Sequence, residues 1–148
     1  MIESQAEKIE IPEMKASIFE AWIRFLYCDE VELTENNVVE LLMLADKYSL
    51  KDLQRICEEY LVKTLTLENF VARGKVAEMD GTNYLRRAVV DFGSRNIAKI
   101  KENGIFGELS NSLLADIIYK LHDKISIIEK NNGIVNILKG LIIVLCLS

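Results

Sequence analysis

Apolar residues recur at helical spacing in the first third of the chain. Between Ala16 and Tyr27 they occupy positions i, i+3, i+4 and i+7, which predicts a helix whose buried face is formed by Phe19, Trp22, Ile23 and Leu26. Ile18 and Phe25 add a second apolar side, so we expect this helix to be buried on more than one flank. Upstream, Lys8 to Ile11 alternates charged and apolar residues ahead of Pro12, a pattern that predicts one short edge strand.

Two further helices are predicted between Thr34 and Leu61. Thr34 is a suitable N-cap for the first, whose apolar stripe is Val38, Leu41, Leu42, Ala45 and Tyr48. Ser49 and Asp52 have the spacing of a capping box, which predicts the start of the second helix. Its core positions are Leu50, Leu53, Ile56, Cys57, Tyr60 and Leu61. Because almost no loop joins the two helices, we expect them to form an antiparallel hairpin.

Weaker helical patterns continue through the second half of the chain. They cover residues 67–79, 82–96 and a last stretch that ends near residue 121. Thr66 repeats the cap signal before the first of them, and Gly74 lies inside it at a cost of about 1 kcal/mol relative to alanine. Ser110 or Ser112 is the expected cap of the last. The fold class predicted from these patterns is mostly α, built from helical hairpins.

Composition supports a helical domain in a reducing compartment. The chain has 148 residues, half of them apolar, and its single proline favours long helices over a many-turned β-fold. The three cysteines, Cys28, Cys57 and Cys146, lack the spacing of a disulfide framework. We therefore expect a cytoplasmic or nuclear protein.

The net charge of −5 is unevenly distributed along the chain. Residues 1–65 carry 7 Lys and Arg against 14 Asp and Glu, whereas residues 66–148 carry 11 against 9. Neither half contains a basic stripe suited to phosphate backbones, so we do not expect a nucleic-acid partner.

No residue constellation in the chain points to catalysis, a metal or a cofactor. His122 is the only histidine, and its place beside Asp123 near a predicted helix end is accounted for by the helix dipole. The adjacent Glu58 and Glu59 do not face each other on a helix, so they do not form an acid–base pair. A phosphate loop, a dinucleotide fingerprint and a serine nucleophile elbow are all lacking from the sequence. We therefore expect an interaction module that is not an enzyme.

Several short segments, in order, carry a family resemblance. They are Ile9-Glu10-Ile11, Phe19, Trp22-Ile-Arg-Phe-Leu-Tyr27, Leu41-Leu-Met-Leu-Ala-Asp-Lys-Tyr48, Leu53 and Cys57-Glu-Glu-Tyr-Leu61. Together they resemble the C-terminal half of a BTB/POZ domain, as found in speckle-type POZ and RCC1/BTB-type cullin adaptors. Residues 66–121 resemble the BACK-type helices that follow such domains, through Asn69, Val76-Ala77, Leu85, Phe92, Asn96 and Leu113-Leu114.

The resemblance implies three segments. Residues 1–64 are expected to be a partial BTB/POZ domain whose first half is missing, 65–124 BACK-like helices, and 125–148 an unassigned apolar tail. Residues 133–148 of that tail are strongly apolar but interrupted by Asn136 and Lys139, and the uninterrupted run from Gly140 to Leu147 is far shorter than the roughly 20 apolar residues of a spanning helix. We expect a helix that packs back on exposed core, or an unselected terminus, rather than a membrane anchor.

The resemblance also implies a function. BTB–BACK proteins are substrate adaptors of cullin-3-type RING ubiquitin ligases, and their BTB domains form homodimers or heterodimers in the intact protein. Their apolar-x-acidic motif matches Met1-Ile2-Glu3, and the tyrosine of their F-I-Y segment matches Tyr27. Met1, Glu3 and Tyr27 are therefore the implied cullin-binding residues. Tyr27 has an alternative interpretation as a packed helix end with its hydroxyl bonded locally.

Three departures from the family pattern qualify this implied function. Cys28-Asp29 replaces the usual Thr-Gly, which is expected to alter the turn but not the helix. Arg73-Gly74-Lys75 falls where the first BACK helix carries apolar residues that line an auxiliary cullin groove. The chain also includes no substrate-binding module. The alternatives are a non-ubiquitin BTB scaffold or oligomerisation module, transcriptional or cytoskeletal, and a non-functional fragment.

Overall fold

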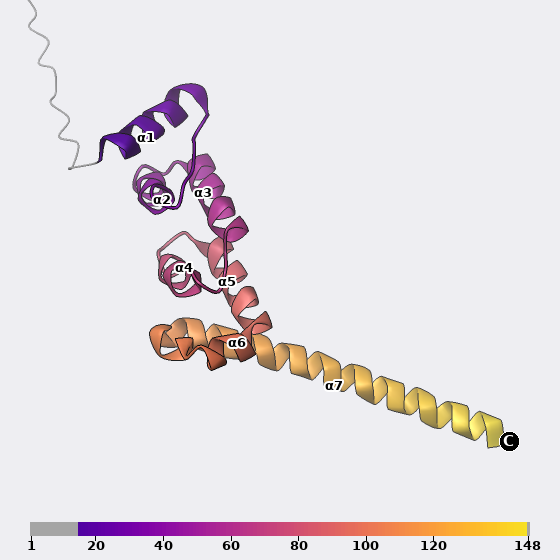
Figure 1. Ribbon diagram of the computed structural model, residues 1–148. Helices are drawn as coiled ribbons and strands as arrows, with labels where there is room; N and C mark the ends of the chain where they lie inside the picture. The colour runs from indigo at the N-terminus through magenta and orange to yellow at the C-terminus, as the bar shows by residue number, and fades with distance from the viewer. Residues whose placement is uncertain (1–14, 148) are drawn as a thin grey trace, which may run out of the picture. The chain divides into compact units, whose positions relative to one another are not determined.

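The computed structural model describes residues 15–147, and the side chains of residues 15–133 and 137 (Figure 1). Across this range the chain is helical and forms no strand, which confirms the predicted mostly-α class. The elements are α1 (Ala16–Cys28), α2 (Val38–Lys47), α3 (Lys51–Lys63), α4 (Phe70–Val76), α5 (Asn83–Arg95), α6 (Ile97–Glu102), the 3₁₀ helix η1 (Ile105–Glu108) and α7 (Asn111–Leu147). The edge strand predicted at residues 8–11 lies outside the described residues.

The chain divides into two compact units, residues 1–60 and 61–148. In the first unit α1 packs on α2, and the buried side of α1 consists of Ile18 and Phe25, which are 2% and 7% exposed. The face predicted for burial is instead half-buried or exposed: Phe19, Trp22, Ile23 and Leu26. That prediction was wrong because α2 covers the second apolar side of α1, and periodicity alone does not tell which of two apolar sides a neighbour covers.

Helix α2 begins at Val38 with Asn37 as its N-cap residue, so Thr34, predicted as the N-cap, instead begins the turn that precedes the helix. The Thr34 N–H donates to Asn37 Oδ1 at 2.8 Å, and the Val38 N–H donates to the Thr34 carbonyl at 3.1 Å. Asn37 Nδ2 donates to the Glu32 carbonyl at 2.9 Å, which ties the preceding segment to the helix start. The Asn37 side chain thus reaches back three residues to the Thr34 N–H, a contact of the same form as in a capping box.

The same arrangement recurs before α4. The Thr66 N–H donates to Asn69 Oδ1 at 2.8 Å, and Asn69 Nδ2 donates to the Thr64 carbonyl at 2.8 Å. Thr66 therefore begins the turn that leads into α4, as predicted, although α4 itself is shorter than the helix predicted over residues 67–79. A Thr-x-x-Asn sequence thus begins helical structure in each unit.

Ser49 ends α2 and does not cap α3. Its φ of 56° lies in the left-handed region, the Leu50 N–H donates to the Ala45 carbonyl at 2.8 Å, and the Ser49 N–H donates to the Asp46 carbonyl at 3.0 Å. These two bonds form a Schellman motif in which serine takes the place usual for glycine. The capping box predicted for Ser49 was wrong, because an N-cap residue has an extended backbone, not a left-handed one.

In the second unit, α5 is the central helix and packs against α4, α6 and α7 (Figure 1). Side chains buried in this unit are Leu61, Phe70, Ala77, Leu85, Val89, Ile100, Leu109, Leu113 and Ile117. Two glycines lie where helices approach closely. A Cβ at Gly74 would be 2.8 Å from Leu113 Cδ2, and one at Gly93 would be 2.8 Å from Ile117 Cδ1. Ser110 caps α7, because its Oγ accepts the Leu113 N–H at 3.1 Å.

Polar contacts fix the register of α5 against α7. Arg86 Nε and Nη2 donate to Asp116 Oδ2 at 2.9 and 2.7 Å, and Nη2 also donates to Ser112 Oγ at 2.8 Å. At the other end of α5, Lys124 Nζ donates to Ser94 Oγ at 2.8 Å.

Helix α7 is longer than predicted. It runs from Asn111 to Leu147, so His122 lies in the middle of a helix and not near its C-terminal dipole. Residues 122–132 contain neither proline nor glycine, and Gly133 alone, at about 1 kcal/mol, does not end the helix. In the part of the chain that the structure describes, no helix is both long and apolar enough to span a membrane.

Candidate protein-interaction site

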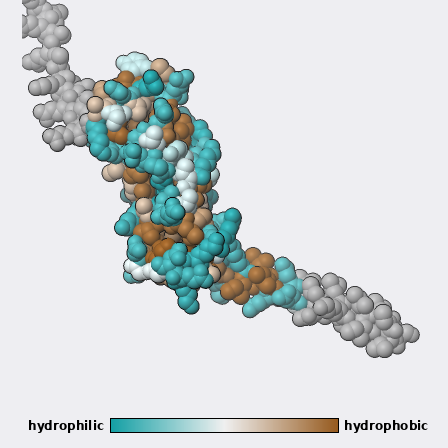
Figure 2. All heavy atoms as spheres, viewed as in Figure 1, coloured by the Kyte–Doolittle hydropathy of each residue, from teal (hydrophilic) through white to brown (hydrophobic). Residues whose placement is uncertain are grey.

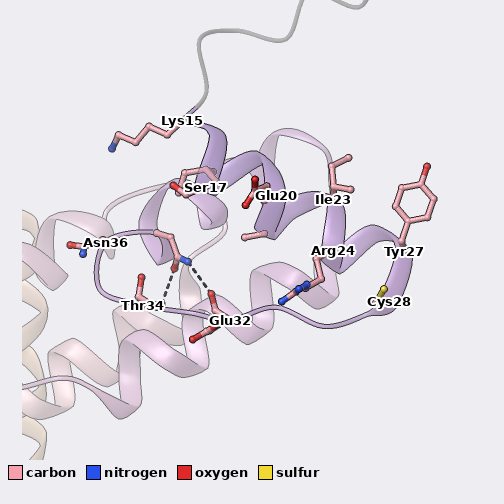
Figure 3. Close-up of a pocket in the computed structure, with 13 residues that line it drawn as sticks. Lys15, Ser17, Glu20, Ile23, Arg24, Tyr27, Cys28, Glu32, Thr34 and Asn36 are labelled. Atoms are coloured by element: carbon pink, nitrogen blue, oxygen red, sulfur yellow. Dashed lines mark hydrogen bonds between the residues drawn. The ribbon is translucent and has the colours of Figure 1, made fainter.

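An open groove of about 890 Å³ runs along α1 in the first unit (Figure 3). One wall is α1 itself and the other is the segment that leads into α2, which the Asn37 bonds hold in place. The lining includes charged groups of both signs, Lys15, Glu20, Arg24 and Glu32, together with the apolar side chains of Ile18 and Ile23. A surface with apolar patches and a charged rim is suited to contact with another protein.

Tyr27 lies at one end of this groove, in the last turn of α1 (Figure 3). Its side chain is 83% exposed, which contradicts the alternative of a packed helix end. The helix continues through Cys28, so the Cys28-Asp29 replacement leaves it intact, as expected. Asp29 takes a φ of 54°, and its N–H donates to the Phe25 carbonyl at 2.9 Å. Asp29 thus adopts the left-handed conformation that glycine adopts most easily.

Of the three implied cullin-binding residues, the structure describes only Tyr27, because Met1 and Glu3 lie outside the described residues. Glu20 and Arg24 join Tyr27 in lining the groove, and sequence reasoning did not single them out. The signal was present in the sequence, because Glu20, Arg24 and Tyr27 recur at i, i+4 and i+7 and therefore share one face of α1.

A second exposed surface of the first unit is aromatic. The rings of Phe19 and Trp22 lie 6.1 Å apart between centroids, and those of Trp22 and Tyr48 5.2 Å apart. Lys47 Nζ lies 5.5 Å from the centroid of the Tyr48 ring. Trp22 Nε1 is buried and has no hydrogen-bond partner within the described residues. This cluster joins the outer side of α1 to the end of α2, and Leu26 and Tyr48 remain 45% and 44% exposed.

The two described cysteines differ in environment. Cys28 is exposed at the groove, whereas Cys57 is buried in α3. Burial in an apolar environment, and secondarily the negative charge of Glu58, raises the pKa of the Cys57 thiol to about 12. Cys57 is therefore a core thiol, as predicted from its apolar stripe. Among residues whose side chains the structure describes, no three His, Cys, Asp or Glu gather closely enough to hold a metal ion.

Arg73-Gly74-Lys75, the segment of α4 that departs from the family pattern, is mostly buried. Arg73 is 4% exposed and its Nη2 donates to Thr64 Oγ1 at 3.2 Å, and Gly74 is buried against α7. Only Lys75 of the three residues is exposed. Arg73 and Gly74 therefore serve packing within the second unit and do not present a surface to a partner.

Comparison with known proteins shows what the first segment is similar to. Residues 1–65 match the model of the BTB/POZ domain. Two proteins of Arabidopsis thaliana, "ARM repeat protein interacting with ABF2" and "Armadillo BTB Arabidopsis protein 1", are 31% and 26% identical to the chain over 115 residues. Each match covers 78% of this chain and 16% of the relative, so the chain spans about one sixth of the length of these relatives. Residues 1–65 of the chain are therefore similar to the BTB/POZ domain family.

Proposed function

We propose that this chain is an adaptor whose BTB segment binds the N-terminal helices of a cullin-3-type scaffold, in the cytoplasm or nucleus. BTB domains mediate protein–protein contacts, and armadillo-BTB relatives are consistent with an interaction module. The observation that carries the proposal is the 83% exposure of Tyr27 at the end of a groove with a charged rim. In the intact protein the BTB domain would also pair with a second BTB domain.

The physical basis of the proposal is the anchor that Tyr27 offers. A tyrosine supplies a large apolar ring and a hydroxyl at a low cost in side-chain entropy, and such residues are enriched among interface hot spots. Arg24 and Glu32, on opposite walls of the groove, would fix the orientation of a partner helix by charge. The acidic character of residues 1–65 would also favour encounter with a basic partner.

Residues 65–124 enter the proposal as BACK-like helices. Their support is the α4–α5 pair, which is preceded by the same Thr-x-x-Asn turn as α2. Because Arg73 and Gly74 are buried, we do not assign a cullin contact to these two residues.

The proposal is tested by measuring, with biolayer interferometry, the dissociation constant between the full chain and the N-terminal domain of a cullin-3 protein. Replacing Tyr27 with alanine should raise the dissociation constant by about 30-fold or more, the effect of losing a hot spot of about 2 kcal/mol. Glu3→Ala should also weaken binding. Tyr119, which is 69% exposed in α7, provides the control, and Tyr119→Ala should leave affinity within about threefold.

Two outcomes would contradict the proposal. Unchanged affinity after both Tyr27→Ala and Glu3→Ala would refute the residue assignment. A wild-type chain that does not bind the cullin domain at all would refute the adaptor function.

A second candidate function is a BTB scaffold outside ubiquitin ligases. It is favoured by the printed name of one relative, a protein interacting with ABF2. The aromatic cluster of Phe19, Trp22 and Tyr48 would be the contact surface. It does not include Tyr27, the residue proposed to bind the cullin. Interferometry with ABF2 distinguishes the two functions, because Tyr48→Ala should then weaken binding whereas Tyr27→Ala should not. No binding of ABF2 by the wild-type chain would exclude this candidate.

A further inference from the structure

Helix α7 carries apolar side chains that the rest of the second unit leaves uncovered. Beyond its contact with α5, the helix extends away from the other helices of this unit (Figure 1). Ile118, Ile125 and Ile128 are 61%, 54% and 58% exposed, and hydrophobic atoms are visible on the extended part of the helix (Figure 2). An apolar surface of this kind on a soluble helix indicates an interaction site.

The uncovered residues follow a coiled-coil pattern. Ile118, Leu121, Ile125, Ile128 and Asn132 alternate steps of three and four residues, which are the a and d positions of a heptad repeat. At 100° per residue they fall within a stripe about 80° wide, centred about 60° from Ile117. Ile117 is buried against Gly93 of α5, so the stripe flanks the α5 contact: Leu121 is half-buried, and Ile118, Ile125, Ile128 and Asn132 are exposed.

The polar residues of the same segment are placed for a second copy of this helix. In the heptad that begins at Ile118, Lys124 is a g position and Glu129 is the following e position. In a parallel, in-register pair, the g position of one helix lies beside the following e position of the other. Lys124 of each copy therefore faces Glu129 of the other copy, which gives two equivalent pairs. Lys124 Nζ donates one hydrogen to Ser94 Oγ and lies 3.9 Å from Asp91 Oδ1 of its own chain, beyond hydrogen-bond distance, so two of its three donors remain for this contact.

Asn132 specifies the same arrangement. It occupies an a position, where two copies of a parallel dimer place their side chains opposite each other. A single asparagine at an a position fixes the register and the dimeric state of a coiled coil, because its amide finds a hydrogen-bond partner only in the matched register. An unrelated helix would have to supply both this amide and the charge opposite Lys124, whereas a second copy supplies both.

We infer that α7 is a homodimerisation helix: two copies of the chain pair in parallel and in register through the stripe of Ile118, Leu121, Ile125, Ile128 and Asn132. This contact is independent of the proposed cullin site, because it lies in the second unit and uses none of the groove residues.

Two neighbouring isoleucines allow a matched test on the full chain. Ile127 and Ile128 are both 58% exposed, but only Ile128 lies on the stripe. Sedimentation equilibrium should show a dimer for the wild type, and Ile128→Asp should raise the dimer dissociation constant at least about 100-fold, because two charges enter one apolar seam. Ile127→Asp should change it by less than about threefold. A wild-type monomer at all concentrations, or equal effects of the two substitutions, would overturn the inference.

Disulfide trapping tests orientation and register. In a background of Cys28→Ser and Cys146→Ser, Asn132→Cys places one thiol opposite its counterpart in a parallel pair and should form a covalent dimer rapidly on mild oxidation. Gly133→Cys, at a b position on the outer side, should form it at least about tenfold more slowly. Equal rates would refute the in-register parallel pair, and faster trapping through Gly133→Cys would assign the contact to another face.

Discussion

Gly93 is the position where the packing of the second unit is most directly open to test. A Cβ added there would lie 2.8 Å from Ile117 Cδ1, 3.2 Å from Ile117 Cγ1 and 3.0 Å from Phe70 Cζ. Phe70 and Ile117 are 0% and 1% exposed, so any shift of either side chain takes place within the core. Gly93→Ala therefore inserts a methyl group between α4, α5 and α7.

The expected change in the free energy of unfolding is the sum of two opposing effects. Alanine gains about 1 kcal/mol over glycine in a helix interior. Overpacking a core by one methyl group costs about 1–3 kcal/mol. We expect a net destabilisation of up to about 2 kcal/mol, in a helix position where propensity alone would predict stabilisation.

A second substitution tests whether contact with Ile117 is the cause. Ile117→Val removes the Cδ1 atom that would lie 2.8 Å from the new Cβ, and alone it should cost about 0.5–1.5 kcal/mol. In the double variant the valine makes room for the alanine, so the two losses should not add. We expect the double variant to be about 1 kcal/mol more stable than the sum of the single variants.

The assay is urea unfolding followed by circular dichroism at fixed protein concentration. Gly107, where a Cβ would meet nothing within 4 Å, provides the control, and Gly107→Ala should not destabilise the chain by a steric contact. Additivity of the Gly93 and Ile117 substitutions within about 0.5 kcal/mol would refute the packing argument, as would a stabilising Gly93→Ala.

Three further predictions concern the thiols, a helix end and an ion pair. Because burial raises the pKa of Cys57 to about 12, iodoacetamide at pH 8 should modify Cys28 and leave Cys57 unmodified until urea is added, as peptide mapping would show. In the unfolded chain the Cys57 thiol loses its proton near its ordinary pKa of 9.0, whereas in the folded chain it keeps the proton until about pH 12. The stability that Cys57 contributes is therefore fully present below pH 9 and is lost as the pH rises toward 12. A Cys57→Ala chain should therefore lose less stability over that interval, and parallel curves would contradict this. Asp29→Gly should raise the free energy of unfolding by about 1 kcal/mol by removing the left-handed strain, and a decrease in thermal denaturation midpoint would contradict it. Asp116→Asn should cost about 0.5–1 kcal/mol by weakening the bond from Arg86, and a loss that does not shrink in 1 M NaCl would argue against an electrostatic cause.

Helix starts in this chain could be read from the sequence because their cause is local. The Thr66 and Ser110 hydroxyls accept the backbone N–H three residues along, the capping contact that their residue types predict. Ser49 shows the limit of this reasoning, since the same residue type suits an N-cap and, in a left-handed conformation, a helix end. Only the backbone bond from Leu50 to Ala45 distinguishes the two.

The buried face of α1 and the candidate site could be predicted only in part. Both sides of α1 are apolar, and burial of Ile18 in preference to Phe19 depends on which side α2 covers, a contact between distant segments. Tyr27 was assigned by family resemblance, and its exposure follows from its place at the end of α1. The groove beside it could not be predicted, because its two walls, α1 and the segment before α2, are brought together by the packing of α1 on α2.

The proposed contact between Tyr27 and a cullin is tested most directly by photo-crosslinking. The full chain would carry p-benzoylphenylalanine at position 27, or at position 119 as a control at another exposed tyrosine, and would be irradiated with a purified cullin-3 N-terminal domain. We expect a covalent complex from position 27, with the crosslinked peptide in the first cullin helices, and none from position 119. Crosslinking from position 119 alone, or from neither position at concentrations where the two proteins bind, would contradict the assignment of Tyr27 to the interface.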